Sequence, residues 1–218
     1  MSTASKGWDS AHFRELDSIP IAEGLVWHPI RRRFGIHAFG VNAYTSEGAG
    51  KHVVEKHDET SGGAGGHEEL YVVVHGRATF TIGEDTFDAP AGTLVFVADP
   101  ALERSAVAEQ EGTLVLAIGG EAGKAYEVSA WESYFAAIPL FKAERWEEAI
   151  ELIEEGLRER PGHPALLYNL ACAESRAGRT EAALEHLQQA VAADPKYLGY
   201  ARTDPDFEPV RSEPGFPA

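Results

Sequence analysis

Two pairs of potential metal ligands lie close together in the sequence. His57 and Glu59 are separated by one residue, and so are His67 and Glu69. In an extended chain, residues at i and i+2 project from the same side, so each pair presents an imidazole and a carboxylate on one face. If the two faces meet in the fold, these groups give a nitrogen and oxygen site of the kind that binds divalent iron, manganese or zinc. The alternative is that the four charged residues, beside a glycine-rich stretch at 62–66, point into water.

Short hydrophobic segments surround these residues. Between about 32 and 120, runs rich in β-branched and aromatic residues are punctuated by glycine, aspartate and proline at intervals of roughly ten residues. Such spacing is typical of an all-β sandwich or barrel. We expect its core to rest on four residues and their neighbours: Tyr71, Val73, Phe80 and Phe96.

The periodicity becomes helical beyond about residue 126. KAERWEEAIELIEEGLRERP (142–161) aligns without gaps to RAGRTEAALEHLQQAVAADP (176–195), an offset of 34 residues. That offset is the period of the tetratricopeptide repeat, and the unit at 164–197 resembles this family. Ala183 and Ala190 are small enough for two helices to approach closely, whereas Glu174 stands where an aromatic residue is usual. The last residues, YLGYARTDPDFEPVRSEPGF, resemble the cap that ends many such arrays.

The segment HEELYVVVHGRATF (67–80) resembles the first motif of jelly-roll cupins, HEExxYVxxGxxxF. Glu69 stands at the position of that family's metal-binding glutamate. In the second motif, GTLVFVADPALE (92–103), Glu103 stands where a metal-binding histidine is usual. The His-x-His pair that normally precedes the glutamate is absent, and His57 with Glu59 is its nearest substitute. The resemblance implies a jelly roll with a divalent metal ion (Fe, Mn or Zn) held by residues drawn from His57, Glu59, His67, Glu69 and Glu103.

Composition limits the classes of partner. The net charge of −16 argues against nucleic acid, because that binding depends on basic patches. Cys172 is the single cysteine, so an internal disulfide and a thiolate zinc cluster are excluded. No apolar run approaches the ~20 residues of a membrane span, and the first residues lack the apolar core of a signal peptide. We expect a cytoplasmic protein that binds neither nucleic acid nor membrane.

These observations predict an α+β multidomain chain in three parts. An N-terminal extension occupies 1–29, a cupin-type jelly-roll β-barrel occupies 30–127, and tetratricopeptide-like helical repeats with a C-terminal cap occupy 128–218. Two small repeats bury little apolar surface alone, so the cap is expected to cover the last hairpin.

Three functions are compatible with this organisation. The favoured one is a regulatory or sensory cupin that binds a small molecule, with or without a metal, and whose helical repeats bind another protein. The second is a metal-dependent cupin enzyme of the isomerase, dioxygenase or decarboxylase class, acting on a small polar metabolite. The third is a degenerate cupin scaffold without metal. A homodimer is compatible with each. No Ser-His-Asp order, P-loop or dinucleotide fingerprint is visible.

Overall fold

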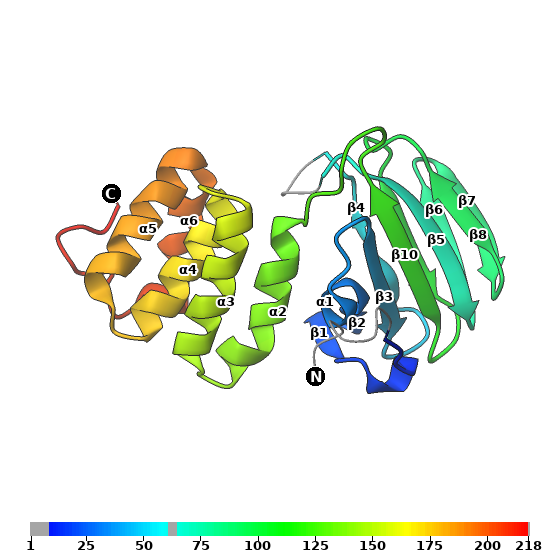
Figure 1. Cartoon of the computed structure of the whole chain (residues 1–218), viewed down its shortest axis with the longest axis horizontal. Helices are drawn as coiled ribbons and strands as arrows, with labels where there is room; N and C mark the ends of the chain where they lie inside the picture. The colour runs from blue at the N-terminus through cyan, green and yellow to red at the C-terminus, as the bar shows by residue number, and fades with distance from the viewer. Residues whose placement is uncertain (1–8, 61–64, 218) are drawn as a thin grey trace. The chain divides into compact units, whose positions relative to one another are not determined.

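A computed structural model describes residues 9–60 and 65–217 and divides the chain into two compact units, Met1–Val128 and Ser129–Ala218 (Figure 1). In the described residues, the first unit is built mainly of strands and the second of helices. The predicted change from β to helical structure is therefore confirmed. Most of the glycine-rich stretch at 62–66 lies outside the described residues, as do the first eight residues of the predicted extension.

Ten strands, one short α-helix, α1 (Ile30–Phe34), and one 3-10 helix (Phe13–Glu15) make up the first unit in its described part. The strands are β1 (Ile19–Ala22), β2 (Leu25–His28), β3 (Gly40–Ser46), β4 (His52–His57), β5 (Glu68–His75), β6 (Arg77–Ile82), β7 (Asp85–Pro90), β8 (Leu94–Val97), β9 (Arg104–Ala108) and β10 (Leu114–Gly120). Residues 19–28, part of the predicted N-terminal extension, form β1 and β2 and thus add two strands to one sheet.

The strands form two antiparallel sheets with the connectivity of a jelly roll. One sheet has the order β1-β2-β3-β10-β5-β8, and the other has the order β4-β9-β6-β7. From β3 to β6 and again from β7 to β10, each successive strand lies in the opposite sheet. This double Greek-key arrangement of eight strands, here β3 to β10, defines the jelly roll. The predicted fold of this unit is confirmed.

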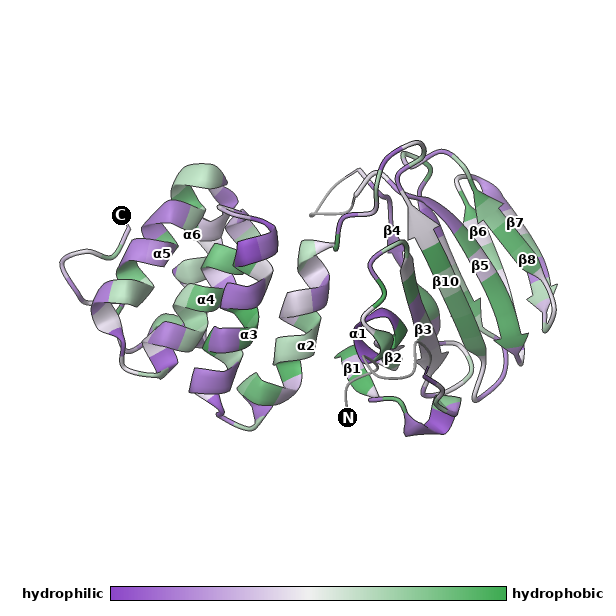
Figure 2. Ribbon diagram, in the orientation of Figure 1, coloured by the Kyte–Doolittle hydropathy of each residue, from purple (hydrophilic) through white to green (hydrophobic). Residues whose placement is uncertain are grey.

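Side chains from both sheets meet in one core. Tyr71 and Val73 of β5 pack with Phe80 of β6 and with residues of β4, β7, β8, β9 and β10. The prediction that Phe96 belongs to this core is wrong, because its side chain is 60% exposed. Alternate residues of a strand point to opposite faces, and on β8 the inward positions are Val95 and Val97. Figure 2 shows β5, β8 and β10 as predominantly hydrophobic ribbons. Hydropathy alone therefore did not indicate which face of these strands is turned toward the core.

The second unit repeats a helical hairpin. Its helices are α2 (Ala130–Lys142), α3 (Trp146–Glu159), α4 (Pro164–Arg176), α5 (Thr180–Ala193) and α6 (Lys196–Ala201). The pair α2–α3 and the pair α4–α5 begin and end 34 residues apart, as the sequence alignment requires. Ala183, Leu187 and Ala190 are fully buried, which confirms the predicted close helix packing. No helix in the described part of the chain is both long and apolar enough to cross a bilayer.

The two hairpin turns differ at one position. Gly178 links α4 to α5 with a φ of 78°, a left-handed conformation that glycine adopts without strain. At the equivalent position between α2 and α3 stands Glu144, with a φ of 53°. It is the one non-glycine residue with positive φ among those described. The first repeat therefore closes through a conformation that costs a side chain about 1–2 kcal/mol.

The C-terminal segment covers the last hairpin. Tyr197, Phe207 and Val210 are buried in the cluster that contains Leu167 and Leu187. Asp204 accepts a hydrogen bond from the Tyr168 hydroxyl at 2.7 Å. These contacts supply the apolar surface that two repeats lack on their own.

Candidate metal centre

Three donor groups meet at one end of β4 and β5. His57 is the last residue of β4, Glu59 follows two residues later, and Glu69 lies near the start of β5. His57 Nε2 is 3.6 Å from Glu59 Oε1 and 3.5 Å from Glu69 Oε2. One donor atom from each residue falls within 4.8 Å of the other two. Both carboxylates are largely buried, whereas the His57 side chain remains about one-third exposed.

The orientation of His57 is fixed by a backbone contact. Its Nδ1 lies 2.6 Å from the carbonyl oxygen of Glu55. A carbonyl can only accept, so Nδ1 carries the proton and donates, which turns Nε2 toward Glu59 and Glu69. Histidines that bind metals in proteins are usually held in this way, with one ring nitrogen on a carbonyl or carboxylate and the other facing the ion.

Glu59 is positioned through its own backbone. Its N–H donates to the carbonyl of Pro100 at 2.9 Å, and its carbonyl accepts from the N–H of Gly66 at 2.8 Å. Burial, together with the nearby Glu69 carboxylate, raises the pKa of Glu59 to about 7. The fold therefore holds a carboxyl group where its charged form is disfavoured.

Glu69 has partners that favour its charge. Burial by itself raises the pKa of this carboxyl, but hydrogen bonds from His57 and Tyr71 outweigh burial and lower the pKa overall. The Tyr71 hydroxyl donates to Oε2. Arg104, which is fully buried, places its Nε 3.4 Å from the same oxygen. On the neighbouring strand β10, the residue opposite is Gly119, where an added Cβ would lie 3.1 Å from Glu69 Cγ. Glycine there leaves space for the Glu69 side chain.

His67 lies beside this group and is also buried. Its Nδ1 is 3.5 Å from Glu59 Oε2, and its ring packs on Tyr126 with centroids 5.7 Å apart. A Cβ added at Gly65 would lie 2.1 Å from Nε2, so that side of the ring faces backbone at a position that only glycine permits. His67 thus contacts the group through Glu59 and lies outside the set of three mutually close donors.

The donor set fits a divalent transition metal or zinc. Bonds of about 2.0–2.2 Å place two tetrahedral ligands about 3.4 Å apart. The separations of 3.5 and 3.6 Å between His57 Nε2 and the two carboxylates agree with that value. One imidazole and two carboxylates are ligands that iron, manganese and zinc accept. His57, Glu59 and Glu69 are therefore the residues that would hold the ion.

A second group of similar residues lies in the helical unit and has a structural explanation. Cys172, Asp204 and Asp206 also present donor atoms close together. However, Asp204 accepts from the Tyr168 hydroxyl and from the Asp206 N–H at the start of a short helix. Burial raises the pKa of the Cys172 thiol well above its ordinary value, which keeps it protonated. The contacts of Asp204 are therefore explained by helix capping and by Tyr168, and Cys172 is explained as a buried core thiol.

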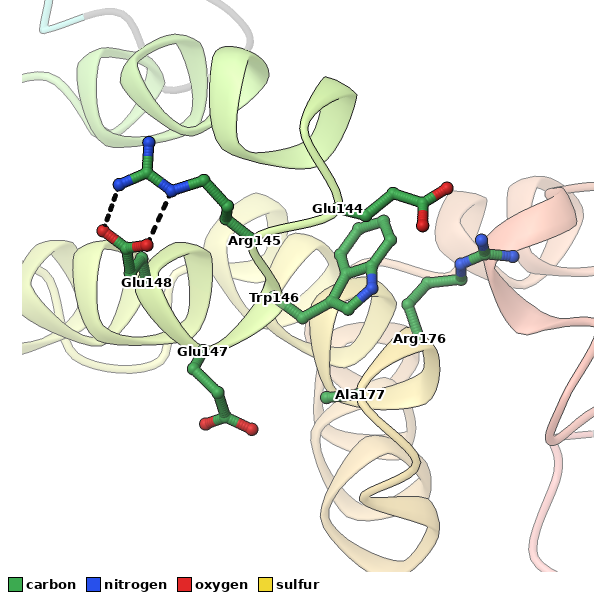
Figure 3. A pocket seen from close by; sticks show the side chains of 7 residues that line it. All are labelled: Glu144, Arg145, Trp146, Glu147, Glu148, Arg176 and Ala177. Atoms are coloured by element: carbon green, nitrogen blue, oxygen red, sulfur yellow. Dashed lines mark hydrogen bonds and ion pairs between the residues drawn. The ribbon is translucent and has the colours of Figure 1, made fainter.

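A hollow lies in the helical unit between the start of α3 and the end of α4 (Figure 3). Its volume is about 340 Å³, and its lining includes Trp146 and Arg176, whose guanidinium carbon lies over the indole ring at 5.2 Å from the ring centroid. Arg145 is paired with Glu148, as Figure 3 shows, and Arg179 pairs with Glu147. The other lining residues are Glu144 and Ala177.

Comparison with known proteins yields matches for both units. Residues 140–203 match the family model described as tetratricopeptide repeat. Three solved structures align over the first half of the chain. An RmlC-like cupin from Shewanella frigidimarina is 18% identical, with 52% of this chain and 95% of that chain covered and a TM-score of 0.39. KdgF from Halomonas sp. is 16% identical, with 51% and 93% covered and a TM-score of 0.40. A Cupin 2 conserved barrel domain protein from Salinispora arenicola is 15% identical, with 52% and 92% covered and a TM-score of 0.41.

No curated protein sequence matches that of the chain. The strand order of the first unit and the family match of the second nevertheless determine the architecture. The chain joins a jelly roll to tetratricopeptide-like helices.

Within the jelly roll, the structure brings four of the five predicted ligands together. His57, Glu59 and Glu69 form the three-donor group, and His67 contacts it through Glu59. Glu103 lies elsewhere: its carboxylate pairs with Lys56 at 2.8 Å, and the side chain is 55% exposed. The residue that follows Glu103 has the opposite orientation: Arg104 points inward on β9, and its Nε lies 3.4 Å from Glu69 Oε2.

Two residues of the site were missed from the sequence. Arg104 and Tyr71 both contact Glu69, and neither was expected to do so. A signal for Arg104 does exist in the alternation Arg104, Ala106, Ala108, in which every second residue is buried. An arginine at the start of an otherwise small and apolar inward face must have a buried partner. Tyr71 lies two residues after Glu69 and hence on the same face of β5.

Proposed function

We propose that the cupin-type unit binds a divalent metal ion through His57, Glu59 and Glu69, and that this centre holds a small polar ligand. One observation carries the proposal: His57 is fixed on the Glu55 carbonyl so that its other nitrogen faces two buried carboxylates. When bound, such an ion supplies a Lewis-acidic positive charge that attracts and orients oxygen-bearing ligands.

The protein's own residues then preserve the site. Tyr71 donates to Glu69 and fixes which carboxylate oxygen faces His57. The Pro100 carbonyl accepts from both the Glu59 N–H and Arg104 Nη1, so one backbone group positions a ligand residue and its charged neighbour. Burial of both carboxylates limits competition from water. These contacts support a binding or sensory function, because His57, Glu59 and Glu69 provide the ligands and Tyr71 and the Pro100 carbonyl hold them in place.

A specific observation also favours the enzymatic alternative. The pKa of Glu59 is raised to about 7, chiefly by burial. A carboxyl group with a pKa near the working pH is suited to take up and release a proton. An isomerase or decarboxylase acting on a small polar metabolite is therefore the second candidate. Turnover of such a metabolite by the metal-loaded chain, with a rate that changes between pH 6 and 8, would distinguish an enzyme from a sensor.

Metal content tests the proposal directly. The purified full chain would be stripped with chelator, reloaded separately with Fe²⁺, Mn²⁺ and Zn²⁺, and the bound metal counted by mass spectrometry. We expect about one ion per chain, and its loss in His57→Gln. Glu103→Gln is the matched control, since Glu103 pairs with Lys56 at the surface. Equal metal content in wild type and His57→Gln would refute the centre, and absence of metal in wild type would leave the scaffold function.

We further propose that the tetratricopeptide-like unit binds a segment of another protein. The family match supports this, as does the hollow beside Trp146 (Figure 3). Its lining includes the Glu144 carboxylate, and the chain as a whole has a net charge of −16, so a basic segment is the complementary partner. Fluorescence titration with a lysine-rich peptide and its glutamate counterpart tests this. Only the basic peptide should bind, and Trp146→Ala should weaken its binding.

A second copy of the chain is the proposed partner of the jelly roll's outer face. Val74, Leu94 and Phe96 are 51%, 66% and 60% exposed, and Leu94 and Phe96 lie on β8, the last strand of its sheet. These three exposed side chains carry no charge, which favours contact between two copies of so acidic a chain. Isologous dimers are the commonest assemblies of soluble proteins.

A further inference from the structure

One buried cation of the jelly roll is incompletely bonded. Arg104 is fully buried on β9, where it lies opposite His57 of β4 and Ile82 of β6. Its Nη1 donates to the Pro100 carbonyl at 3.2 Å. Its Nε and Nη2 have no hydrogen-bond partner within the described residues. Buried charged donors are rarely left unsatisfied in native proteins, because the cost of removing them from water is then uncompensated.

The two unsatisfied nitrogens belong to the same edge of the guanidinium. The Nε–H and one Nη–H of arginine are parallel and match the spacing of the two oxygens of a carboxylate, which they bind as a bidentate pair. Glu69 does not supply this pair. Its Oε2 lies 3.4 Å from Nε without a hydrogen bond, and that oxygen also accepts from Tyr71 and faces His57 Nε2 at 3.5 Å. The ion pair thus offsets part of the charge and leaves the hydrogen-bonding edge open.

The charge balance of the proposed metal centre also indicates that the charge of Arg104 lacks a partner. Two carboxylates, Glu59 and Glu69, neutralise a divalent ion, and His57 must be neutral to act as a ligand. The charge on Arg104 is then left without compensation beside the centre. A buried site with net positive charge attracts an anion, and low local polarity strengthens that attraction.

We infer that Arg104 is the recognition residue for a small carboxylate ligand, which pairs with the Nε and Nη2 edge beside the metal centre. This rests on the proposed function, since the charge balance assumes an ion at His57, Glu59 and Glu69. It adds the chemical class of the ligand: a small organic acid with at least one free carboxylate. The partly exposed side of His57 is where the donor group meets solvent.

The test uses the full chain loaded with Zn²⁺, an ion without redox chemistry. Calorimetric titration with formate, glycolate and succinate would measure binding, with glycolamide as the neutral counterpart of glycolate. We expect at least one carboxylate to bind and glycolamide to bind far more weakly. Arg104→Met should weaken carboxylate binding roughly 10- to 100-fold, the effect of losing hydrogen bonds to a charged group. Arg104→Lys, which keeps the charge and loses the planar edge, should lie between.

Arg77→Met is the matched control. Arg77 forms a paired contact with Asp88 on the surface of β6 and β7, and its side chain is 48% exposed. Its substitution should leave carboxylate affinity unchanged. Metal content, measured in each variant, separates the two proposals: an absent metal refutes the centre, whereas retained metal with unchanged glycolate affinity in Arg104→Met refutes Arg104 as the recognition residue. Failure of all three carboxylates to bind, or phosphate binding as tightly as glycolate, would equally overturn the carboxylate assignment.

Discussion

Glu59 is expected to reduce the stability of the metal-free protein at neutral and alkaline pH. The pKa of its carboxyl rises from 4.5 to about 7 in the folded chain, mainly through burial. A group with a raised folded pKa stabilises the fold below its unfolded pKa, and this stability is lost as pH rises through the folded value. At about 1.4 kcal/mol per pKa unit, the difference corresponds to about 3 kcal/mol at pH 8. Glu59→Gln removes the charge while keeping the shape.

Unfolding experiments in the presence of chelator measure this effect. Urea denaturation combined with hydrogen exchange of peptides from β5 and β6 reports on the jelly roll alone. Glu59→Gln should be more stable than wild type at pH 8, by up to about 3 kcal/mol, and the advantage should shrink to below about 1 kcal/mol at pH 5. Adding Zn²⁺ should stabilise wild type and not the variant. Glu103→Gln should change stability by less than about 0.5 kcal/mol. A variant that is equally stable or less stable at pH 8 would refute the reasoning.

Four further outcomes follow from other contacts. Glu69→Gln should abolish metal uptake, and unchanged metal counts would remove the centre as described. In the helical unit, the Glu174 carboxylate lies 2.7 Å from His186 Nδ1 and raises the pKa of His186. The pair therefore stabilises the folded unit fully below pH 6.5, and this contribution is lost as pH rises through the higher pKa of the folded state. Protection of the α4 and α5 backbone amides against hydrogen exchange should therefore fall from pH 6 to 8, and Glu174→Gln should make this loss of protection smaller. Glu144→Gly should stabilise the helical unit by about 0.5–1 kcal/mol in thermal unfolding. An unfolding temperature below that of the wild type would contradict this. Phe96→Glu should yield monomers in light scattering where wild type yields dimers, and an unchanged mass in both would exclude this interface.

The fold could be predicted from the sequence because each unit has a strong periodicity. Alternation and regularly spaced turns indicated the β unit, and the offset of 34 residues indicated the repeated helices. Phe96 was misplaced because a short strand such as Val95-Phe96-Val97 is apolar on both faces. When one face is not polar, alternation cannot indicate which side faces the core.

The candidate site was only partly predictable. His57 and Glu59 were predicted from their i and i+2 spacing, and Glu69 from its place in the segment that resembles the first cupin motif; the three lie together in the structure. The error at Glu103 arose from the register of the second motif, which a one-residue shift changes from the outer to the inner face. Contacts between strands far apart in sequence, such as Arg104 with Glu69, depend on sheet pairing that no local pattern specifies.

The helical unit shows how a departure from a family pattern can be compensated. Glu174 stands where an aromatic residue is usual, and its side chain is only 3% exposed. A buried, unpaired carboxylate would cost several kcal/mol, so the substitution requires a partner. His186 on α5 provides it, twelve residues later and across the hairpin. Because an imidazole loses its proton near neutral pH, the replacement exchanges an aromatic contact that is indifferent to pH for one that depends on it. The same substitution therefore makes the α4–α5 packing sensitive to protons.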